Sequence, residues 1–591
     1  MVWQAWLTAG IVLVMLGAMA TDRAKPETAI GAALAALILL GLVTPARAVA
    51  GFANEGVLTI ALLYVVAAAV RRSGALGPIV GLVLGRAGRP GMVLLRLMAP
   101  VALASGVLNN TPLVAMLLPE VRAWARRHNV APSRLLLPLS YAAIVGGLLT
   151  VMGTSTNLVV NGLLVEAGLA PIGFADIGRI GLPIAVGGIA LLALFHRWLL
   201  PDRPESDAIF ADPRAFTTEL MVEKGGPFDG RALIGAKLAD GSPLLPVEIA
   251  RDGHVLGAPR LDEILVAGDR LIIAGDATTV VAASATVGLG KAVTSAFDVH
   301  ALGAERQLVE VVVSDQCPLV GGRVGEGSFR ANYGAAIIAI ARHGERVQRA
   351  RAGGWNLLAG DTLLVEAGSE FVATYRFHPH FHVVLGAAVQ APAPGSHAVI
   401  ALATLGAMVS LASTGVLSVL EAAIAACVVL FFTRVVDQRV LRESVDLRVL
   451  FAIAAALGVG AAIDQSGLAA LAADGVVGLA GDSPRLALAA VLVASVAATE
   501  VLTNNAAAVL MLPLALATAH DLGCSTTPFA VAVMVGASAS FVTPTGYQTN
   551  LMVFGPGGYR FVDFVRAGLP MSLLVVALSI WLLPLLWPLA P

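Results

Sequence analysis

The stretch Gly106–Pro119, GVLNNTPLVAMLLP, places two asparagines, a threonine and an early proline inside an apolar run. A similar string, TNNAAAVLMLP, ends at Pro513, and 513 − 119 = 394 residues separate the final prolines. Amide and hydroxyl groups within an apolar segment are costly unless they are hydrogen-bonded or bind something. The two strings therefore predict a duplicated structure with a shared polar feature.

The composition indicates a protein that crosses a membrane several times. The chain has 591 residues, of which 57% are hydrophobic and 13% are charged, and its mean hydropathy is +0.84. Soluble proteins carry about 25% charged residues. Several uncharged windows approach the ~20 residues that a helix needs to cross a bilayer. The absence of a basic run argues against a nucleic-acid partner, and three scattered cysteines show no metal-ligand spacing.

Three further landmarks recur in the same order. They are the glycine of RRSGAL and DQSGLA, the asparagine of GTSTNLVV and YQTNLMV, and the aspartate of FADIGRIGLP and FVDFVRAGLP: Gly74 and Gly467, Asn157 and Asn550, Asp176 and Asp563. Such order indicates an internal duplication. We predict membrane repeats at residues 1–204 and 383–591, separated by a polar insert.

Loop charge predicts that the two repeats have opposite orientations. The segment 120–134 carries Arg122, Arg126, Arg127 and Arg134, whereas its counterpart HDLGCSTTP has no Lys or Arg. Short cytoplasmic loops are enriched in these residues, so the pattern is that of an inverted repeat. Each half should hold about five spanning helices, one re-entrant hairpin (about 88–122 and 485–519) and a broken helix (about 135–165 and 527–553). The insert would be cytoplasmic.

The polar insert also repeats itself. VEIARDGHVLGAPRLDEILVAGDRLIIAGD is echoed by IIAIARHGERVQRARAGGWNLLAGDTLLVEAG, each with an Arg-ended strand and a later Ala-Gly-Asp turn. We predict two tandem α+β modules at 208–296 and 304–378. His378, His380 and His382 then mark the return to the membrane rather than a metal site.

The apolar helices are broken at four matching places by Gly, Pro, Asn, Ser and Thr: 105–112, 153–157, 499–506 and 542–550. Non-helical backbone at membrane depth is tolerated where it lines a cavity or is buried in protein, and matched breaks point to a transport site. Free N–H groups suit an anion, and exposed oxygens suit a small cation. One such motif alone would favour packing, but four symmetric ones favour a site. None contains Lys or Arg, which favours a doubly negative substrate moving with cations.

The hairpin tips read Asn109-Asn110-Thr111 and Thr503-Asn504-Asn505, and the later turns read Gly153-Thr154-Ser155-Thr156-Asn157 and Thr543-Pro544-Thr545-Gly546. We interpret the second turn as carrying an insertion before Asn550. With these motifs the chain resembles the divalent anion/Na⁺ symporter family of the ion transporter superfamily. It is most similar to the bacterial and algal branch with two central TrkA-C (RCK-C) domains.

The resemblance implies the ligands of two Na⁺ ions and of the substrate. The first Na⁺ would use Ser105, Asn109, Asn110 and the backbone near Gly153, and the second Thr499, Thr503, Asn504 and the backbone near Val542. The substrate would contact Asn110, Thr111, Thr154, Asn504, Asn505 and Thr545. The family also implies elevator-type movement, a homodimer, and TrkA-C domains that bind a small ligand or dimerise.

We therefore expect a secondary active transporter in the cell inner membrane, not an enzyme, with Na⁺ as the coupling ion and no cofactor. Sulfate is the first candidate substrate, and a di- or tricarboxylate is the second. Glu500, beside the second tip, leaves H⁺ coupling open against a role in satisfying the nearby backbone. The rival from another class is a ligand-gated channel or sensor governed by the soluble modules.

Overall fold

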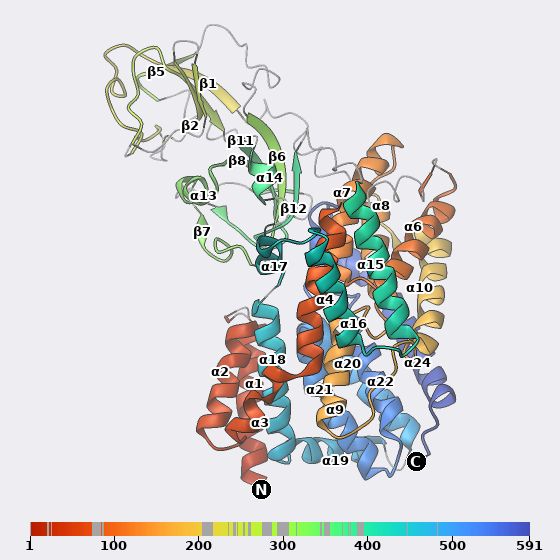
Figure 1. Cartoon of the computed structure of the whole chain (residues 1–591). Helices are drawn as coiled ribbons and strands as arrows, with labels where there is room; N and C mark the ends of the chain where they lie inside the picture. Colours follow the sequence, from red (N-terminus) through yellow and green to blue (C-terminus); the bar gives the residue numbers. More distant parts are fainter. Residues whose placement is uncertain are drawn as a thin grey trace.

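The computed structural model contains a body of helices and, at one end, a strand-rich insert (Figure 1). The structure describes residues 2–20, 23–24, 26–73, 84–85, 88–203, 217–234, 236–239, 244, 246–251, 254–257, 262–274, 286–291, 306–314, 316–324, 326–342, 345–347, 355–368, 370–375, 378, 380–386, 395–445, 447–480 and 483–590. Both termini lie at the end of the helical body opposite the insert (Figure 1).

The helices of the first half are α1 (Val2–Ala20), α2 (Pro26–Leu39), α3 (Pro45–Ala50), η1 (Gly51–Ala53), α4 (Glu55–Arg72), α6 (Pro90–Ser105), α7 (Asn110–Arg127), α8 (Ser133–Gly146), α9 (Ser155–Glu166) and α10 (Gly178–Leu199). Those of the second half are α15 (Ser396–Ser413), α16 (Val419–Phe432), α17 (Gln438–Ser444), α18 (Leu447–Gln465), α19 (Leu468–Ala480), α20 (Pro484–Val501), α21 (Asn504–Asp521), α22 (Thr526–Ser538), α23 (Gln548–Phe554) and α24 (Phe561–Leu586).

Among the described residues, six helical segments are long and apolar enough to cross a membrane: Pro45–Arg72, Gly178–Leu199, Ser396–Ser413, Leu447–Gln465, Pro484–Val501 and Phe561–Leu586. Six further apolar helices are shorter, among them Pro90–Ser105, Ser133–Gly146 and Thr526–Ser538. The chain is therefore a multi-pass helical membrane protein. The total of about ten spanning helices stays a prediction.

The two halves pack against each other reciprocally. Helix α2 contacts α18, and α16 contacts α4 in the matching way. Within each half α6 packs on α8 and α20 on α22, and α10 meets its counterpart α24. Reciprocal contacts of this kind are those of a two-fold axis. The direction of this axis relative to the membrane, and therefore the opposite orientation of the two repeats, is inferred from the loop charges alone.

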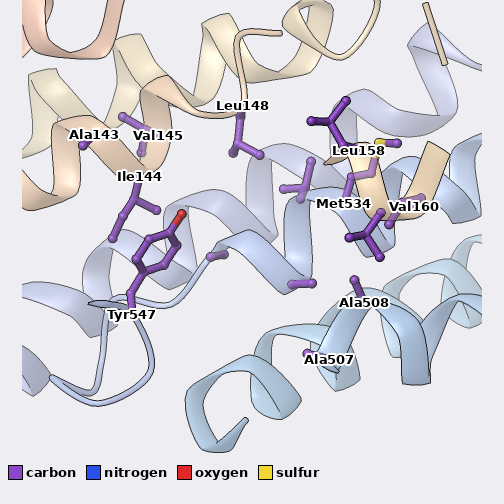
Figure 2. Packing of buried hydrophobic residues seen from close by; sticks show 14 of the residues in the cluster. Ala143, Ile144, Val145, Leu148, Leu158, Val160, Ala507, Ala508, Met534 and Tyr547 are labelled. Atoms are coloured by element: carbon purple, nitrogen blue, oxygen red, sulfur yellow. The ribbon is translucent and has the colours of Figure 1, made fainter. Parts of the chain in front are cut away.

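Both halves contribute to one apolar core beside the breaks in the helices. Figure 2 shows members of this cluster from both halves, among them Ala143, Val145 and Leu148 of the first half and Ala507 and Met534 of the second. All five side chains are fully buried. The polar turns described below are thus surrounded by tightly packed apolar groups, which makes any unpaired polar atom there expensive.

Among the described residues of the insert, two five-stranded sheets have the same topology, and β7 and β10 form a separate two-stranded sheet. The first has the order β3-β2-β4-β1-β5 and the second β12-β6-β11-β8-β9, so that β1, β2, β3, β4 and β5 correspond to β6, β8, β9, β11 and β12. The bounds of the first module are β1 (Thr217–Val222), β2 (Pro246–Arg251), β3 (His254–Gly257), β4 (Arg270–Ala274) and β5 (Leu289–Lys291). Those of the second are β6 (Arg306–Val313), β7 (Arg323–Val324), α13 (Glu326–Tyr333), β8 (Ala336–Arg342), β9 (Glu345–Arg346), β10 (Trp355–Asn356), β11 (Thr362–Gly368), α14 (Glu370–Tyr375) and β12 (Phe381–Gly386).

The repeated Arg and Ala-Gly-Asp signals of the insert form the same ion pair twice. Arg251 Nε donates to Asp269 Oδ1 at 2.7 Å, and Arg342 Nε donates to Asp361 Oδ1 at 2.6 Å. In both modules the guanidinium thereby ties the end of one strand to the turn that begins another. The sequence echo therefore reflects a duplicated module.

The second module extends beyond the predicted boundary at residue 378. Strand β12 runs to Gly386 and pairs with β6, so the predicted start of the second membrane repeat at residue 383 falls inside a strand. His380 lies within the module, its Nδ1 2.9 Å from the Tyr333 hydroxyl. In the described part of the chain no group of His, Cys, Asp and Glu could hold a metal ion.

A buried ion pair fastens the second module to helix α7. Arg122 donates to both carboxylate oxygens of Glu310 on β6, at 2.9 and 3.2 Å, and the two side chains are 2% and 10% exposed. Arg122 is therefore not a loop residue as predicted, because α7 continues to Arg127. The second module also contacts the membrane part at Gly555. This glycine lies so close to Thr362 that a Cβ atom added to it would be 2.6 Å from Thr362 Oγ1.

We predict that Glu310→Gln destabilises the protein by about 3–5 kcal/mol, because the buried Arg122 guanidinium loses the negative charge that faces it. The matched control is Glu219→Gln in the first module. Glu219 occupies the equivalent strand position but pairs with the more exposed Arg270, so its loss should cost at most about 1 kcal/mol. Thermal unfolding of the purified full-length protein measures both, and equal effects would contradict the buried-pair interpretation.

Candidate functional site

Each hairpin turns within a few residues, and an asparagine follows the turn. Helix α6 ends at Ser105 and α7 begins at Asn110, while α20 ends at Val501 and α21 begins at Asn504. Pro112 is tolerated near the start of α7 because the first N–H groups of a helix have no partner within it. The tip asparagines are thereby held where a helix N-terminus is exposed.

Ser105 bridges its hairpin to the broken helix behind it. Its Oγ lies 2.8 Å from the Ala143 carbonyl oxygen and 2.6 Å from Asn110 Oδ1, and all three groups are buried. A hydroxyl has one hydrogen and cannot donate to both oxygens. One of the two short contacts therefore needs another explanation.

The same bridge occurs in the second half. Thr499 Oγ1 lies 2.6 Å from the Ala537 carbonyl oxygen and 3.1 Å from Asn504 Oδ1. The three positions are displaced by 394 residues from those of the first half (499 − 105, 504 − 110 and 537 − 143). The hairpin signals in the sequence thus correspond to one repeated polar contact.

Three oxygens surround one end of the Asn110 carboxamide: Ser105 Oγ at 2.6 Å, the Ala143 carbonyl at 3.1 Å and the Gly153 carbonyl at 3.2 Å. With Oδ1 at this end, four oxygens converge and no hydrogen lies between most of them. With Nδ2 at this end, the two amide hydrogens face the three oxygens, Ser105 is free to donate to the Ala143 carbonyl, and Oδ1 accepts from the Tyr547 hydroxyl. Convergent oxygens are the ligand set of a small hard cation. We refer to these four groups as the oxygen cluster.

The turn after each broken helix is closed by an asparagine. Asn157 Nδ2 donates to the carbonyls of Gly147 and Thr150 at 3.2 and 3.1 Å. Asn550 does the same for the carbonyls at 540 and 543, at 3.0 and 3.2 Å. The offset is 393 for all three positions. The amides thereby satisfy carbonyls that the break leaves without a helical partner.

This constant offset corrects the predicted insertion before Asn550. The two turns match without a gap, as GTSTN and GYQTN, so Gly546 is the counterpart of Gly153 and Tyr547 that of Thr154. Gly546 also has the same steric requirement, because a Cβ there would lie 2.1 Å from Ser540 Oγ. Thr545 corresponds to a methionine of the first half and is exposed.

Each hairpin tip reaches the broken helix of the opposite half. Thr111 Oγ1 donates to Gln548 Oε1 at 3.1 Å. In the counterpart, Ser155 Oγ and Thr156 Oγ1 donate to Asn505 Oδ1 at 3.2 and 3.4 Å. The predicted tip residues are thus brought to the first turns of α23 and α9.

The remaining predicted residues, Asn109, Thr503, Val542 and Thr545, differ in their contacts. Asn109 and Thr503 precede α7 and α21, and only Thr503 caps its helix, accepting from the Ala506 N–H at 3.4 Å. The Val542 N–H donates to Glu500, and no described contact brings Thr545 to a tip. Sequence reasoning missed the Ala143 and Ala537 carbonyls, Tyr547 and Gln548. A gap-free comparison of the two turns would have found Tyr547 and Gln548.

Residues 11–536 match the citrate transporter family. The chain belongs to this family. The relationship confirms the transporter class inferred from the hairpin motifs and excludes an enzyme, because the family consists of transporters.

Relatives of this citrate transporter family member match it over nearly their full length. It is 34% identical to the "Putative sulfur deprivation response regulator" of Chlamydomonas reinhardtii, over 93% of this chain and 96% of that protein. It is 26% identical to sodium/sulfate cotransporter 2 of the same alga, over 97% of this chain and 89% of that protein. An uncharacterized transporter of Synechocystis is 29% identical over 100% of this chain and 98% of its own length.

In this family member, Glu500 closes the second broken turn. Its carboxylate accepts from the backbone N–H groups of Phe541, Val542 and Thr543, each at 2.9 Å, and from Thr543 Oγ1 at 2.8 Å. The equivalent position in the first half, 500 − 394, is Gly106. The carboxylate thereby satisfies N–H groups that the break leaves without a helical partner. The geometry therefore supports the backbone-satisfying role.

We predict that Glu500→Gln lowers the thermal stability of the purified protein by about 2–4 kcal/mol, because an amide leaves part of the donors unmatched and adds its own. Thr543→Val removes a single hydroxyl from the same turn and should cost about 1 kcal/mol. Near-normal stability of Glu500→Gln together with an altered pH dependence of uptake would contradict this role and support proton coupling.

Proposed function

We propose that this chain is a Na⁺-coupled transporter of a small divalent oxyanion, with sulfate as its first substrate. The observation that carries the proposal is the oxygen cluster around Asn110, next to the hairpin tips. Its support is the match over 97% of the chain to a protein named a sodium/sulfate cotransporter.

One Na⁺ would be bound by Ser105 Oγ, Asn110 Oδ1 and the carbonyls of Ala143 and Gly153. With Asn110 Oδ1 turned toward Ser105, these four oxygens converge, and the cation would resolve the contact that a single Ser105 hydrogen leaves unpaired. Asn109, which the family resemblance also implies as a ligand, would contribute from the hairpin tip.

The second Na⁺ would be bound by Thr499, Asn504 and the Ala537 carbonyl, where the same hydrogen deficit occurs. Thr503, Gly546 and the predicted Val542 would complete this site from the adjoining turns. The two cations would be related by the same two-fold axis as the hairpins.

The anion would lie between the tips. Thr111, Asn505 and Thr154 supply hydroxyl and amide donors, Asn110 and Asn504 border the cation sites, and Thr545 lies on the exposed side of its turn. The N-termini of α7, α21 and α9 add backbone N–H groups with a positive dipole end. Residues 105–112 and 499–506 contain no Lys or Arg, so two Na⁺ ions would balance a dianion.

Alternating access would follow the elevator scheme, in which each hairpin moves with its partner broken helix. The scaffold would form a homodimer, and the insert would face the cytoplasm of an inner-membrane protein. The two modules would act as TrkA-C-like regulatory domains, by ligand binding or by dimerisation.

A carboxylate substrate is the second candidate, favoured by the description of the family as citrate transporters. Coupling to H⁺ instead of Na⁺ would need a proton-exchanging group, and Glu500 is instead occupied with four donors of its own turn. A channel or sensor would need no cation gradient.

Uptake into proteoliposomes tests the proposal. We expect accumulation of radiolabelled sulfate when an inward Na⁺ gradient is imposed, and little when K⁺ replaces Na⁺. Succinate and citrate serve as competing substrates, and stronger competition by either than by sulfate itself would favour the carboxylate reading. Uptake indifferent to Na⁺ and H⁺ gradients would contradict the symporter.

We further predict that Asn110→Ala and Asn504→Ala each reduce sulfate uptake at least 100-fold, because each removes a cation ligand. Asn332→Ala, an exposed amide on α13, is the matched control and should transport normally. Size-exclusion profiles and thermal unfolding establish that the variants are folded. Transport retained by both site variants would show that the hairpin assignment is wrong.

A further inference from the structure

Tyr547 breaks the two-fold symmetry of the site. It directly precedes α23, whereas the counterpart that precedes α9 is Thr154 (547 − 154 = 393). The tyrosine is 8% exposed. In Figure 2 its ring rises from the turn with the hydroxyl directed toward the segment that carries Ala143, Ile144 and Val145. The first half of the site thus receives a hydroxyl that the second half lacks.

The Tyr547 hydroxyl contacts two of the predicted binding residues. It is hydrogen-bonded to the carboxamide of Asn110, and it lies 3.5 Å from Thr154 Oγ1. Both partners are buried. It is therefore located between a group of the oxygen cluster and a group of the proposed anion site.

The direction of the Asn110–Tyr547 hydrogen bond depends on what the oxygen cluster contains. Without a cation, Asn110 Nδ2 faces the three oxygens and Oδ1 accepts from the Tyr547 O–H. With a cation, Oδ1 must face the metal, because an amide NH₂ group has no lone pair to offer. Nδ2 then faces Tyr547 and donates to its oxygen, as in the other orientation. The single hydrogen of Tyr547 is thereby released from Asn110.

We propose that Tyr547 transmits Na⁺ occupancy to the anion site. Binding of Na⁺ turns the Asn110 amide, and the freed Tyr547 O–H then donates to the anion, or to Thr154 beside it. Without Na⁺ the same hydrogen is consumed by Asn110 Oδ1, and the anion loses a donor. No bond other than hydrogen bonds changes, and Tyr547 acts as a positioning residue for coupling. The inference rests on the proposed function.

This connection between a cation site and the anion site involves only the cation site of the first half. Among the described residues, the hydrogen-bond contacts of Thr154 Oγ1 are with Thr156 and Tyr547, not with Asn504. The shorter threonine therefore does not connect the second cation site to the anion. Of two Na⁺ ions, only the one bound at Asn110 would strengthen anion binding by this route.

The test compares Tyr547→Phe with Tyr141→Phe in the full-length protein. Tyr141 is also buried, and its hydroxyl donates to the Phe541 carbonyl at 2.6 Å without touching Asn110. The KM and kcat for sulfate are measured in proteoliposomes at low and at saturating external Na⁺. A direct measurement accompanies them: the thermal shift that sulfate produces in purified protein, in Na⁺ and in K⁺.

We expect KM for sulfate to fall as Na⁺ rises in the wild type and in Tyr141→Phe. In Tyr547→Phe, KM at saturating Na⁺ should be roughly tenfold higher, the change expected for one lost hydrogen bond to a charged group. Its KM should respond little to Na⁺, with a smaller change in kcat, and the sulfate-induced thermal shift should be alike in Na⁺ and K⁺. Half-maximal activation by Na⁺ should stay within about threefold of wild type, because the ligand oxygens remain.

Two results would overturn the inference while leaving the proposed function intact. One is a Tyr547→Phe variant whose KM falls with Na⁺ as in the wild type. The other is a variant that loses Na⁺ activation altogether, which would make Tyr547 part of the cation site. A wild-type protein without Na⁺-dependent sulfate uptake would instead overturn the proposed function, and this inference with it.

Discussion

The structure of the membrane part depends on the need to pair every polar group that the breaks in its helices expose to an apolar core. Ser105 and Thr499 meet this need in the same way, since each joins a tip asparagine to a carbonyl of the neighbouring broken helix. With the tip carboxamide oxygen turned toward the hydroxyl, one hydrogen serves two oxygen contacts in each pair. A metal cation would take the place of the missing hydrogen in that orientation, whereas at Asn110 the opposite orientation supplies amide hydrogens instead.

The two halves solve the same problem with different residues. Where the second half has Glu500, the first has Gly106, and where the second has Tyr547, the first has Thr154. The Glu500 carboxylate accepts hydrogen bonds from the N–H groups of its turn. The first half has Gly106 at that position and therefore no carboxylate there. A protein with a two-fold backbone can thus give equivalent positions different tasks: in the second half, Glu500 closes the broken turn, and Tyr547 of the same turn contacts Asn110 at the tip of the first hairpin.

The sequence was sufficient to predict the duplication and the tip asparagines, because Asn110 and Asn504 stand in strings that are alike over many residues. It also predicted the tandem modules, whose Arg–Asp pairs recur in matching positions. Tyr547 could not be found from the sequence as long as an insertion was assumed before Asn550. The constant 393-residue offset of the asparagine hydrogen bonds shows that the two turns match without a gap. The pairing of Arg122 with Glu310 could not be foreseen, because 188 residues separate the partners and neither is part of a repeated motif.

Helix α7 joins both of these features. Asn110 lies in its first turn, and Arg122 follows 12 residues later, about 18 Å along the same helix at 1.5 Å per residue. Separating a buried guanidinium from its carboxylate is costly, so the Arg122–Glu310 pair fastens the first hairpin to the second module. If the tip moves during transport, the sheet that is paired with α7 moves with it, and a partner that held this sheet in place would slow transport from outside the bilayer.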